Sequence, residues 1–326
     1  MTLRLRVSLY LQTVSVGAPE GLDQFYSVRE CLLLAGLSVG QELTPSTALV
    51  WASGENMEKE QNEVDFSNLR QNVKINQLPG QWLLGRKDCL ARSYRAWREQ
   101  RKCEDFHPRT FLLPQDSEEL EEYFNAKPTR FMIKPVNWFS GLGIKISNKL
   151  DDILLAGGKV VVQEYIDRPQ LLHKRKCDVR VFILVTSLDP LLLYVYNDGV
   201  VSICSQEYSN DYYHSKPAHM TNYSINKTED NFSLKDQRWR LRRLWSHLTD
   251  LGLDTEAAWQ RTKEVCLQTV LSGLEEMRAE FLSARVKSHY NSFKLFAFDI
   301  LYDQHLKPWL LEVTPVECGK IFMNVL

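Results

Sequence analysis

Apolar and polar positions near the end of the chain predict a β-hairpin. Two apolar runs, at residues 292–302 and 307–314, flank a polar turn at 303–306. With the turn centred between its last two residues, Asp299 lies opposite Glu312, and opposed Cβ atoms are roughly 5 Å apart. Two carboxylates so close repel each other unless a cation lies between them. The pattern therefore predicts either a Mg²⁺ site built from one oxygen ligand per strand or a solvated acidic pair on an edge hairpin.

The first part of the chain has the pattern of a small α/β lobe, predicted over residues 1–82. Residues 1–11 begin like a signal peptide, but Gln12 and Thr13 interrupt the apolar run, so a first strand is the better interpretation. Residues 26–34 have helical spacing, and 48–51 form a short buried-strand pattern. The length of 326 residues then leaves room for a central lobe at 83–166 and a C-terminal lobe at 167–326 around a shared cleft.

The central lobe contains strand and turn patterns that suit a nucleotide. A strand ending at residue 135 presents Lys134, and a small-residue turn containing Ser140 and Gly141 leads into another strand. Glycines in such a turn let backbone N–H groups approach phosphate oxygens, although most Gly-x-Gly turns are ordinary turns. Neither a Walker loop nor a Rossmann turn is present. Residues 160–166 form a buried strand whose end is typical of an adenine-binding hinge, with plain core strand as the alternative.

Charged residues introduce the long apolar strand predicted for the C-terminal lobe. Lys176, Asp178 and Arg180 alternate, which places three charges on one strand face. A solvent-exposed strand has the same pattern, whereas charges that lead into a fully apolar run favour a cleft. Farther on, residues 191–204 are predicted to form a hairpin around Asn197-Asp198-Gly199. Residues 219–227 are predicted to be a loop, and 234–284 helical.

Two groups of arginines form basic stripes. In the helix predicted over residues 86–102, Arg92, Arg95 and Arg98 lie on neighbouring turns. A second basic face comes from the segment 234–284, with Arg238, Arg240, Arg242 and Arg243. Each stripe is either a solvated face or a landing surface for an acidic polypeptide.

Composition narrows the class of partner. The net charge is −1, so recognition of a charged partner depends on local patches, and neither nucleic acid nor membrane is expected as a partner. No apolar run approaches the ~20 residues of a membrane span. The seven cysteines are odd in number and contain no Cys-x-x-Cys pair. Reduced thiols in a cytosolic setting are therefore expected, rather than a zinc site or a disulfide framework.

The order of the motifs carries a family resemblance. They run Lys74-Ile75-Asn76 with Pro79-Gly80, Arg86-Lys87-Asp88, Pro108-Arg109-Thr110, Ile133-Lys134-Pro135, Gln163-Glu164-Tyr165-Ile166, Lys176-Cys177-Asp178-Val179-Arg180, residues 219–227, and Phe298-Asp299 with residues 307–313. Each motif alone is weak, but eight in this order are specific. From about residue 48 to 314 the chain closely resembles the tubulin tyrosine ligase-like family, and its polyglutamylase branch most.

The resemblance implies an ATP-grasp fold of the α/β class, with ATP held between two lobes. It also implies an ATP-dependent ligase that adds an amino acid, usually glutamate, to tubulin tails through an acyl phosphate. The implied site residues are Lys87, Lys134, Ser140 and Gly141 for the ATP phosphates, Gln163, Glu164, Tyr165 and Ile166 for adenine, Lys176 and Asp178 to complete the nucleotide pocket, Lys134 and Arg180 for catalysis, Thr221 and Asn222 for the amino acid, and Asp299, Glu312 and Thr314 for Mg²⁺.

Some positions depart from the family pattern. Thr314 stands where the family has an asparagine that binds Mg²⁺, and a hydroxyl reaches less far than a carboxamide. Ser202 stands where the family commonly has an arginine near the amino-acid pocket. The turn at 139–143 lacks the two arginines of many members, and the sequence stops at Leu326, without the usual continuation. These departures cluster at phosphate, metal and amino-acid contacts.

Three interpretations follow from these observations. The first is a working ligase that modifies tubulin in the cytoplasm and cytoskeleton, including cilia or basal bodies. The second is a degenerate or truncated relative that binds nucleotide or tubulin without ligating. The third, an ATP-grasp ligase for a small molecule, fits less well because the resemblance extends beyond the shared ATP-grasp motifs.

Overall fold

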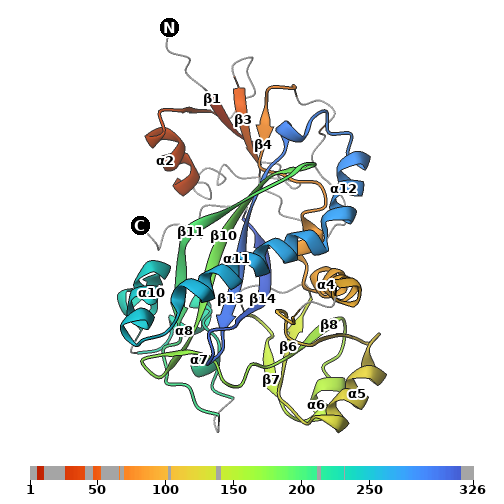
Figure 1. Ribbon diagram of the computed structural model, residues 1–326, viewed down its shortest axis with the longest axis vertical. Coiled ribbons are helices and arrows are strands. Elements are labelled where there is room, and N and C mark those ends of the chain that lie inside the picture. The colour runs from red at the N-terminus through yellow and green to blue at the C-terminus, as the bar shows by residue number, and fades with distance from the viewer. Residues whose placement is uncertain are drawn as a thin grey trace.

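The computed structural model describes residues 6–10, 26–40, 47–52, 66, 70–101, 104–136, 141–210, 214–230 and 232–316, and their strands form three sheets (Figure 1). The predicted site residue Ser140 and the polar segment 53–62 lie outside these described residues. The predicted domain limits after residues 82 and 166 stay predictions.

The first sheet is parallel, with strand order β2-β1-β3-β4. Its strands are β1 (Arg6–Tyr10), β2 (Ser38–Gly40), β3 (Thr47–Ala52) and β4 (Lys74–Ile75), and helix α2 (Tyr26–Leu34) lies between β1 and β2 in the chain. These elements confirm the helix predicted at 26–34, the strand predicted at 48–51 and, over its described residues 6–10, the first strand. Apolar side chains of β3 and β4 pack with Phe66 to form a small core.

The second sheet is antiparallel and has strand order β5-β8-β6-β7. Its strands are β5 (Thr110–Leu113), β6 (Phe131–Pro135), β7 (Lys145–Ser147) and β8 (Val160–Glu164). Apolar residues of helices α5 (Ser117–Ala126) and α6 (Leu150–Leu154) pack with the sheet around the fully buried Phe111 and Phe131. Because β6 and β8 are neighbours, the strands that carry Lys134 and Gln163 lie side by side.

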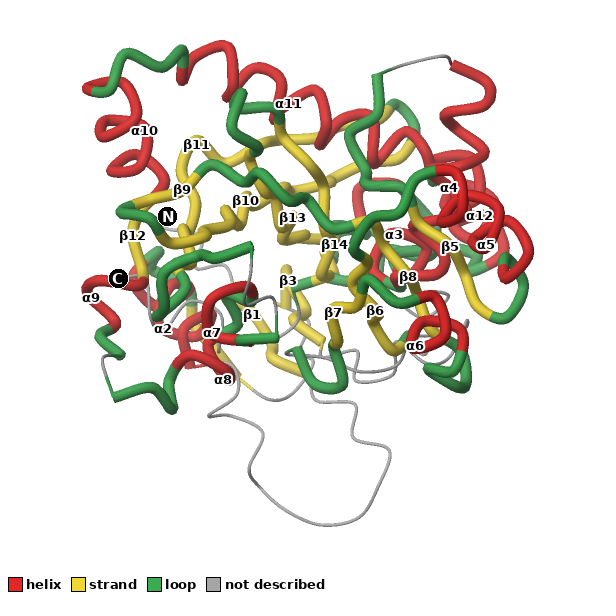
Figure 2. The backbone as a smooth tube through the Cα atoms, turned by 90° about the horizontal axis from the view of Figure 1, so that it is seen from below, coloured by secondary structure: helices red, strands yellow, loops and turns green. Residues whose placement is uncertain are grey.

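The third sheet is the largest and has strand order β12-β11-β10-β13-β14, with β9 paired to β10. Its strands are β9 (Leu171–Leu172), β10 (Arg175–Leu188), β11 (Leu191–Ile203), β12 (Arg238–Arg240), β13 (Lys294–Tyr302) and β14 (Pro308–Pro315). Helix α11 (Thr255–Ser272) crosses this sheet in Figure 1, and Figure 2 shows α10 (Leu241–Asp250) on the same side of the strands. Apolar side chains from these helices and from α12 (Leu274–Ser283) form the main core with the sheet.

Two helices that precede the second sheet in the chain also join this main core. They are α3 (Trp82–Gly85) and α4 (Lys87–Arg101). Leu84 of α3 is fully buried, and Leu90 and Tyr94 of α4 pack in the same cluster as the apolar residues of β10 and β13. Helices α3 and α4, which lead into the second sheet, are therefore packed firmly against the third sheet.

Strand β11 is continuous where the sequence predicted a hairpin at Asn197-Asp198-Gly199, so that prediction is wrong. The chain reverses instead at Asp189-Pro190, between β10 and β11. Residues 196–198 form a bulge opposite Phe182. The buried Asp198 accepts hydrogen bonds from the backbone of Gly199 (2.9 Å) and from Nε of Arg242 (2.8 Å). These donors satisfy the carboxylate of Asp198, a residue type that is more typical of turns than of strands.

The segment 234–284 is not uniformly helical, which corrects a second prediction. Helix α9 (Leu234–Gln237) is followed by strand β12, and Gly273 separates α11 from α12. Arg238 therefore lies on a strand beside β11, apart from the helical arginines of α10. The one-turn helix α8 (Tyr223–Asn226) lies within the predicted loop at 219–227, and another, α7 (Lys216–His219), ends where that loop was predicted to begin.

The described cysteines are free thiols, and none forms a disulfide within the described ranges. They are Cys31, Cys89, Cys177, Cys204 and Cys266. Of the helices that the structure describes, none is both long and apolar enough to cross a membrane.

Candidate active site

Charged residues form a row across the third sheet at the predicted catalytic positions. Arg180 of β10 lies opposite Asp299 of β13, and Asp299 lies opposite Glu312 of β14. The pairing of Asp299 with Glu312 confirms the prediction made from the apolar pattern. Asp178 precedes Arg180 by two residues and shares its strand face.

The cation beside Asp299 in this structure is the guanidinium of Arg180. Nε and Nη2 of Arg180 donate to Oδ1 and Oδ2 of Asp299, each at 2.7 Å. Bidentate pairs of this kind are among the stronger ionic hydrogen bonds in proteins. The charge of Asp299 raises the pKa of Arg180 above its usual value, and burial opposes that rise. Arg180 thus relieves the carboxylate repulsion that the sequence predicted.

A β-bulge on β14 sets the register of the two carboxylates. The ladder shifts by one residue between Asp299 and Ile300, which leaves Leu311 as the extra residue on β14. If the ladder continued from the pair Ile300 and Leu310 without a bulge, Leu311 would pair with Asp299, and Glu312 would lie opposite Phe298, whose side chain is fully buried. The bulge therefore keeps Glu312 out of the core and opposite Asp299.

Lys134 at the end of β6 is buried in a polar network. Its ammonium donates to Oε1 of Gln163 at 2.7 Å and to the carbonyl of the bulged Leu311 at 3.4 Å. Nε2 of Gln163 lies 3.3 Å from both Nε2 of His107 and Oγ1 of Thr110. Burial lowers the pKa of Lys134 to about 8. Two neutral acceptors do not neutralise this ammonium, so it remains available to a phosphate.

One cavity collects several of the predicted phosphate and metal residues. Its lining includes Lys87, Lys134, Gln163 and Glu312, together with His107 and Leu311. The charge of Glu312 favours the charged form of Lys134, whereas the charge of Lys87 disfavours it. Elements distant in sequence, α4, β6, β8 and β14, thus bring two cations and a carboxylate to one place.

The carboxylates of this row suit Mg²⁺ only in combination with other oxygen ligands. The described residues contain no cluster of three or more histidine, cysteine, aspartate or glutamate side chains that could hold a metal. Asp299 uses one lone pair of each oxygen for Arg180, and Glu312 forms no hydrogen bond or ion pair within the described ranges. Acceptor capacity therefore remains on both. Thr314, half-buried on β14, lies opposite Ala297.

The predicted adenine residues point in different directions. The carboxylate of Glu164 accepts from the hydroxyl of Tyr123 (2.9 Å) and from Nζ of Lys127 (2.7 Å), so helix α5 engages its side chain. The side chain of Gln163 belongs to the Lys134 network instead. Ile166 is half-buried.

Tyr165 and Lys176 lie together beneath the hinge. Nζ of the buried Lys176 donates to the hydroxyl of Tyr165 at 3.0 Å, and that hydroxyl lies 2.8 Å from Nδ1 of His219. Burial lowers the pKa of Lys176 and raises the pKa of Tyr165. The structure thus joins two of the predicted nucleotide residues through a hydrogen bond between β10 and the end of β8.

The predicted amino-acid residues lie next to the charged row. The hydroxyl of Thr221 donates to Asp178, and burial, with a further contribution from Asp299, raises the pKa of Asp178 to about 6. Gly141 has a φ of +78° and touches Asn222, because a Cβ built on Gly141 would lie 2.9 Å from Cγ of that asparagine. The glycine turn and the amino-acid residues are therefore in direct contact.

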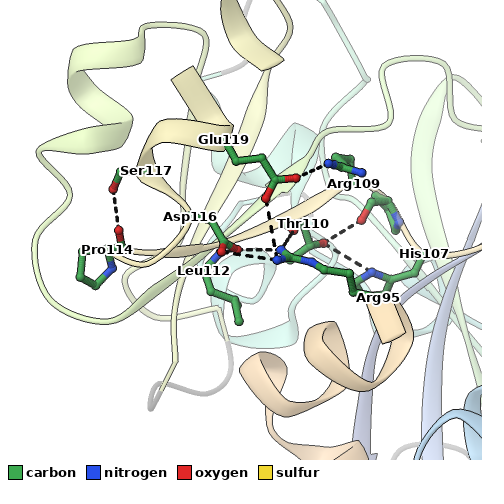
Figure 3. Close-up of polar contacts among 10 residues, drawn as sticks. Arg95, His107, Arg109, Thr110, Leu112, Pro114, Asp116, Ser117 and Glu119 are labelled. Atoms are coloured by element: carbon green, nitrogen blue, oxygen red, sulfur yellow. Dashed lines mark hydrogen bonds and ion pairs between the residues drawn. The ribbon is translucent and has the colours of Figure 1, made fainter. Parts of the chain in front are cut away.

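Carboxylates of the same chain pair with the arginines of the stripe on α4, and Figure 3 shows this for Arg95 and Asp116. Arg95 pairs with Asp116 and Arg98 with Asp105, whereas Arg92 shares Asp88 with Arg86. Arg95 also donates to the carbonyl of Thr110 at 3.1 Å, which ties α4 to β5. The arginines of this stripe thus form ion pairs within the chain, and its role as a landing surface for an acidic polypeptide stays a prediction.

Sequence reasoning missed two residues of the site. His107 is buried against Gln163 and Thr110, and burial together with the charge of Lys134 lowers its pKa to about 3. Its position beside the Pro108-Arg109-Thr110 motif was the available signal. The second is Arg238, whose Nη1 donates to the hydroxyl of Ser202 across β11 and β12. That contact was hidden because β12 had been taken for helix.

Comparison with known proteins connects this geometry to a family. Residues 66–315 match the model of the Tubulin-tyrosine ligase family. Tubulin monoglutamylase TTLL4 of Mus musculus is 35% identical over 260 residues, covering 76% of this chain and 22% of the relative. Tubulin polyglutamylase ttll-4 of Caenorhabditis elegans is 34% identical over 255 residues, covering 76% and 42%.

A further mouse relative, tubulin polyglutamylase TTLL6, is 35% identical over 250 residues, covering 74% of this chain and 30% of the relative. The chain thus spans less than half the length of these relatives. The family match nevertheless covers both the second sheet and the third sheet with its charged row. The chain belongs to the tubulin-tyrosine ligase family and has its ATP-grasp-like fold.

Proposed function

We propose that this chain is an ATP-dependent ligase that adds glutamate to the acidic tails of tubulin. The relatives it matches are named for tubulin glutamylation, and ligases of the family are ATP-dependent in general. The observation that carries the proposal is the cavity in which the buried ammonium of Lys134 lies beside Glu312. The cavity itself encloses only about 10 Å³, so its charged lining, with Lys87, Lys134 and Glu312, is what suits phosphate oxygens and the developing charge of phosphoryl transfer.

The proposed reaction has two steps. A carboxylate oxygen of the acceptor attacks the γ-phosphorus of ATP, and the bond to the bridging oxygen breaks to release ADP and leave an acyl phosphate. The amine nitrogen of glutamate then attacks the acyl carbon, inorganic phosphate leaves with the electron pair of its C–O bond, and the nitrogen loses a proton. No protein nucleophile is needed. Catalysis rests on positioning and on neutralisation of charge.

Named residues divide these tasks. Lys134 and Lys87 would neutralise phosphate oxygens from the side of β6 and α4. Arg180, held flat by both oxygens of Asp299, would face the oxyanion of the second step. Asp299 and Glu312, with Thr314, would hold Mg²⁺, which supplies further charge neutralisation at the phosphates when bound. The proposed site thus combines Lys134 at the end of β6 with the charged row of the third sheet.

A direct assay tests the proposal. Purified protein is incubated with tubulin, Mg-ATP and either labelled glutamate or labelled glycine, and label in tubulin is measured with ADP release. Label from glutamate that depends on ATP supports the proposal, and label from glycine alone would change the amino acid. ATP binding without any label in tubulin would favour the alternative, a relative that binds nucleotide or tubulin but does not ligate. Label that localises to microtubules in cells would support the proposed cytoskeletal and ciliary setting.

Thr314 is expected to limit the rate. A hydroxyl in place of a carboxamide ligand shifts one Mg²⁺ position toward water and loosens the alignment of the γ-phosphate. A misplacement of about 1 Å can cost on the order of 10²-fold in rate, so we expect slow ligation by the natural chain and faster ligation by Thr314→Asn. The measurement is the labelling rate at saturating Mg²⁺, with Thr314→Ala as the matched control. Equal rates for the natural chain and Thr314→Asn would mean that the hydroxyl is an adequate ligand.

A further inference from the structure

Arg238 is placed at the edge of the charged row by strand pairing. Strand β12 pairs with β11 so that Arg238 lies opposite Ser202, and Ser202 lies opposite Asp178 on β10. The guanidinium of Arg238 donates to the hydroxyl of Ser202. The sequence thus has a neutral serine on β11, and the positive charge beside it comes from the next strand.

Arg238 has no carboxylate of its own. Two other arginines near this face of the sheet are paired, Arg180 with Asp299 and Arg242 with Asp198. Arg238 forms no ion pair within the described ranges, and its hydrogen bond to Ser202 is to a neutral group. Burial lowers its pKa, so the half-buried charge is incompletely compensated by the protein. An anion in contact with Arg238 would supply the missing charge.

The nearest acid does not fill this need. Asp178 and Asp299 are close enough to favour the charged form of Arg238, but the carboxylate of Asp178 accepts the hydroxyl of Thr221 and that of Asp299 is bound to Arg180. The charge of Arg180, in contrast, disfavours the charged form of Arg238. Within the described ranges neither Asp178 nor Asp299 accepts a hydrogen bond from Arg238, so its remaining N–H groups can bind the carboxylate of a ligand.

A further donor lies at the same end of the row. Asn222 begins helix α8 and makes no side-chain capping bond, and its carboxamide has no hydrogen-bond partner within the described ranges. It touches Gly141 of the glycine turn. Its neighbour Thr221 is tied to Asp178, opposite Ser202. A cation and an amide donor with unused hydrogen bonds suit a small carboxylate.

Arg238 lies far across the third sheet from the residues proposed to bind the ATP phosphates. From Arg238 the row crosses β11, β10 and β13 to reach Glu312 on β14. Four strand spacings of about 4.8 Å put the two Cα positions roughly 20 Å apart. Lys134 and Lys87 lie with Glu312 at the far end. An anion at Arg238 is therefore a different group from the ATP phosphates.

We propose that Arg238 binds the α-carboxylate of the free amino acid, with Ser202 orienting its guanidinium and Asn222 contributing a donor. This assignment rests on the proposed function, because the free amino acid is a co-substrate of the proposed ligation. The carboxylate of a glutamate in the tubulin tail has the same chemistry, so the experiment contains one arm for each source.

The test measures binding without turnover. Calorimetry in the presence of Mg²⁺ and a non-hydrolysable ATP analogue compares the natural chain with Arg238→Ala, Arg238→Lys and the control Arg240→Ala, whose side chain is exposed on the same short strand. The ligands are L-glutamate, its α-amide isoglutamine, and an acidic tail peptide. Loss of an ionic hydrogen bond should weaken L-glutamate roughly 10- to 100-fold in Arg238→Ala and less in Arg238→Lys. The affinities of Arg238→Ala for isoglutamine, the tail peptide and the ATP analogue should equal those of the natural chain. Arg240→Ala should bind every ligand with unchanged affinity.

A charge exchange keeps the test informative if Arg238→Ala folds poorly. The double variant Ser202→Arg/Arg238→Ser moves the guanidinium to the opposed position across the ladder and should restore much of the glutamate affinity. Unchanged glutamate affinity in Arg238→Ala, or no glutamate binding by the natural chain, would overturn the inference. A loss confined to the tail peptide would overturn it as well. Glutamate binding through Arg238 by a chain that never labels tubulin would uphold this inference and remove the proposed function instead.

Discussion

Asp299→Ala is expected to lose both ligation and stability, whereas Glu312→Ala is expected to lose ligation alone. Asp299 holds both donors of Arg180, and its side chain is 14% exposed and that of Arg180 29% exposed. Removing the carboxylate leaves a half-buried guanidinium unpaired, which should cost about 1.5–3 kcal/mol of unfolding free energy. Glu312 has no hydrogen bond or ion pair within the described ranges, so its loss removes a proposed metal ligand without breaking a contact.

The comparison uses thermal unfolding and the tubulin labelling rate for both variants. We expect labelling to fall by about 10²-fold or more in each, and the melting temperature to fall only in Asp299→Ala. The double variant Asp299→Ala/Arg180→Met is the control, because removing the unpaired cation should recover part of the stability without recovering activity. Full activity in Asp299→Ala would rule out the proposed role of the carboxylate row.

Lys134→Ala is expected to weaken ATP binding by roughly 10- to 100-fold, because a charge-assisted contact to phosphate is worth about 1.5–3 kcal/mol. The pKa of Lys134 is lowered to about 8, so its ammonium is mostly charged at pH 7 and mostly neutral at pH 9. The ATP affinity of the natural chain should therefore fall as the pH rises through 8. In Lys134→Ala that part of the pH dependence should disappear.

Equilibrium binding of an ATP analogue, measured from about pH 6.5 to about pH 9, checks this expectation, because that range includes the pKa of Lys134. Lys149→Ala is the matched control, since Lys149 is exposed before helix α6 and should leave both affinity and its pH dependence unchanged. A Lys134 variant that binds the analogue as tightly as the natural chain would show that the ammonium of Lys134 does not contact the phosphates.

Local patterns predicted much of the fold because they matched the final environment of each residue. The helix at 26–34 and the terminal hairpin have regular apolar spacing, and the structure confirms both. The predicted pairing of Asp299 with Glu312 is correct, although the extra residue Leu311 near the turn was not foreseen. The bulge compensated for the predicted turn centre between His305 and Leu306, because the pairing of Tyr302 with Pro308 centres the actual turn on His305.

Other parts of the structure depend on partners that are distant in sequence. Asp198 signals a turn by residue type, but the backbone and side chain of Arg242 supply donors that make it tolerable inside β11. Gly199 is needed there for a different reason, since a Cβ would lie 2.5 Å from the carbonyl oxygen of Arg180. Neither partner is visible from local spacing.

Charge patterns were the least reliable guide to the candidate site. The stripe containing Arg95 has the spacing of a free basic face, yet Asp116, after strand β5, neutralises it. Arg238 was grouped with the arginines of α10, yet it lies on β12. A positive charge in a sequence gives no information about its counter-charge until the tertiary fold has placed both.

The bulge at Leu311 has a consequence for how such a site can originate. On either side of it, buried and half-buried positions alternate regularly, so a single inserted codon at this point would leave the apolar faces of both halves of β14 unchanged. The insertion would nevertheless create a new backbone acceptor, the carbonyl that now receives Lys134. A chain that lost this codon would keep Asp299 opposite Glu312 and lose only the acceptor. The link between the second sheet and the carboxylate row is therefore a feature that a lineage could gain or lose without refolding its core.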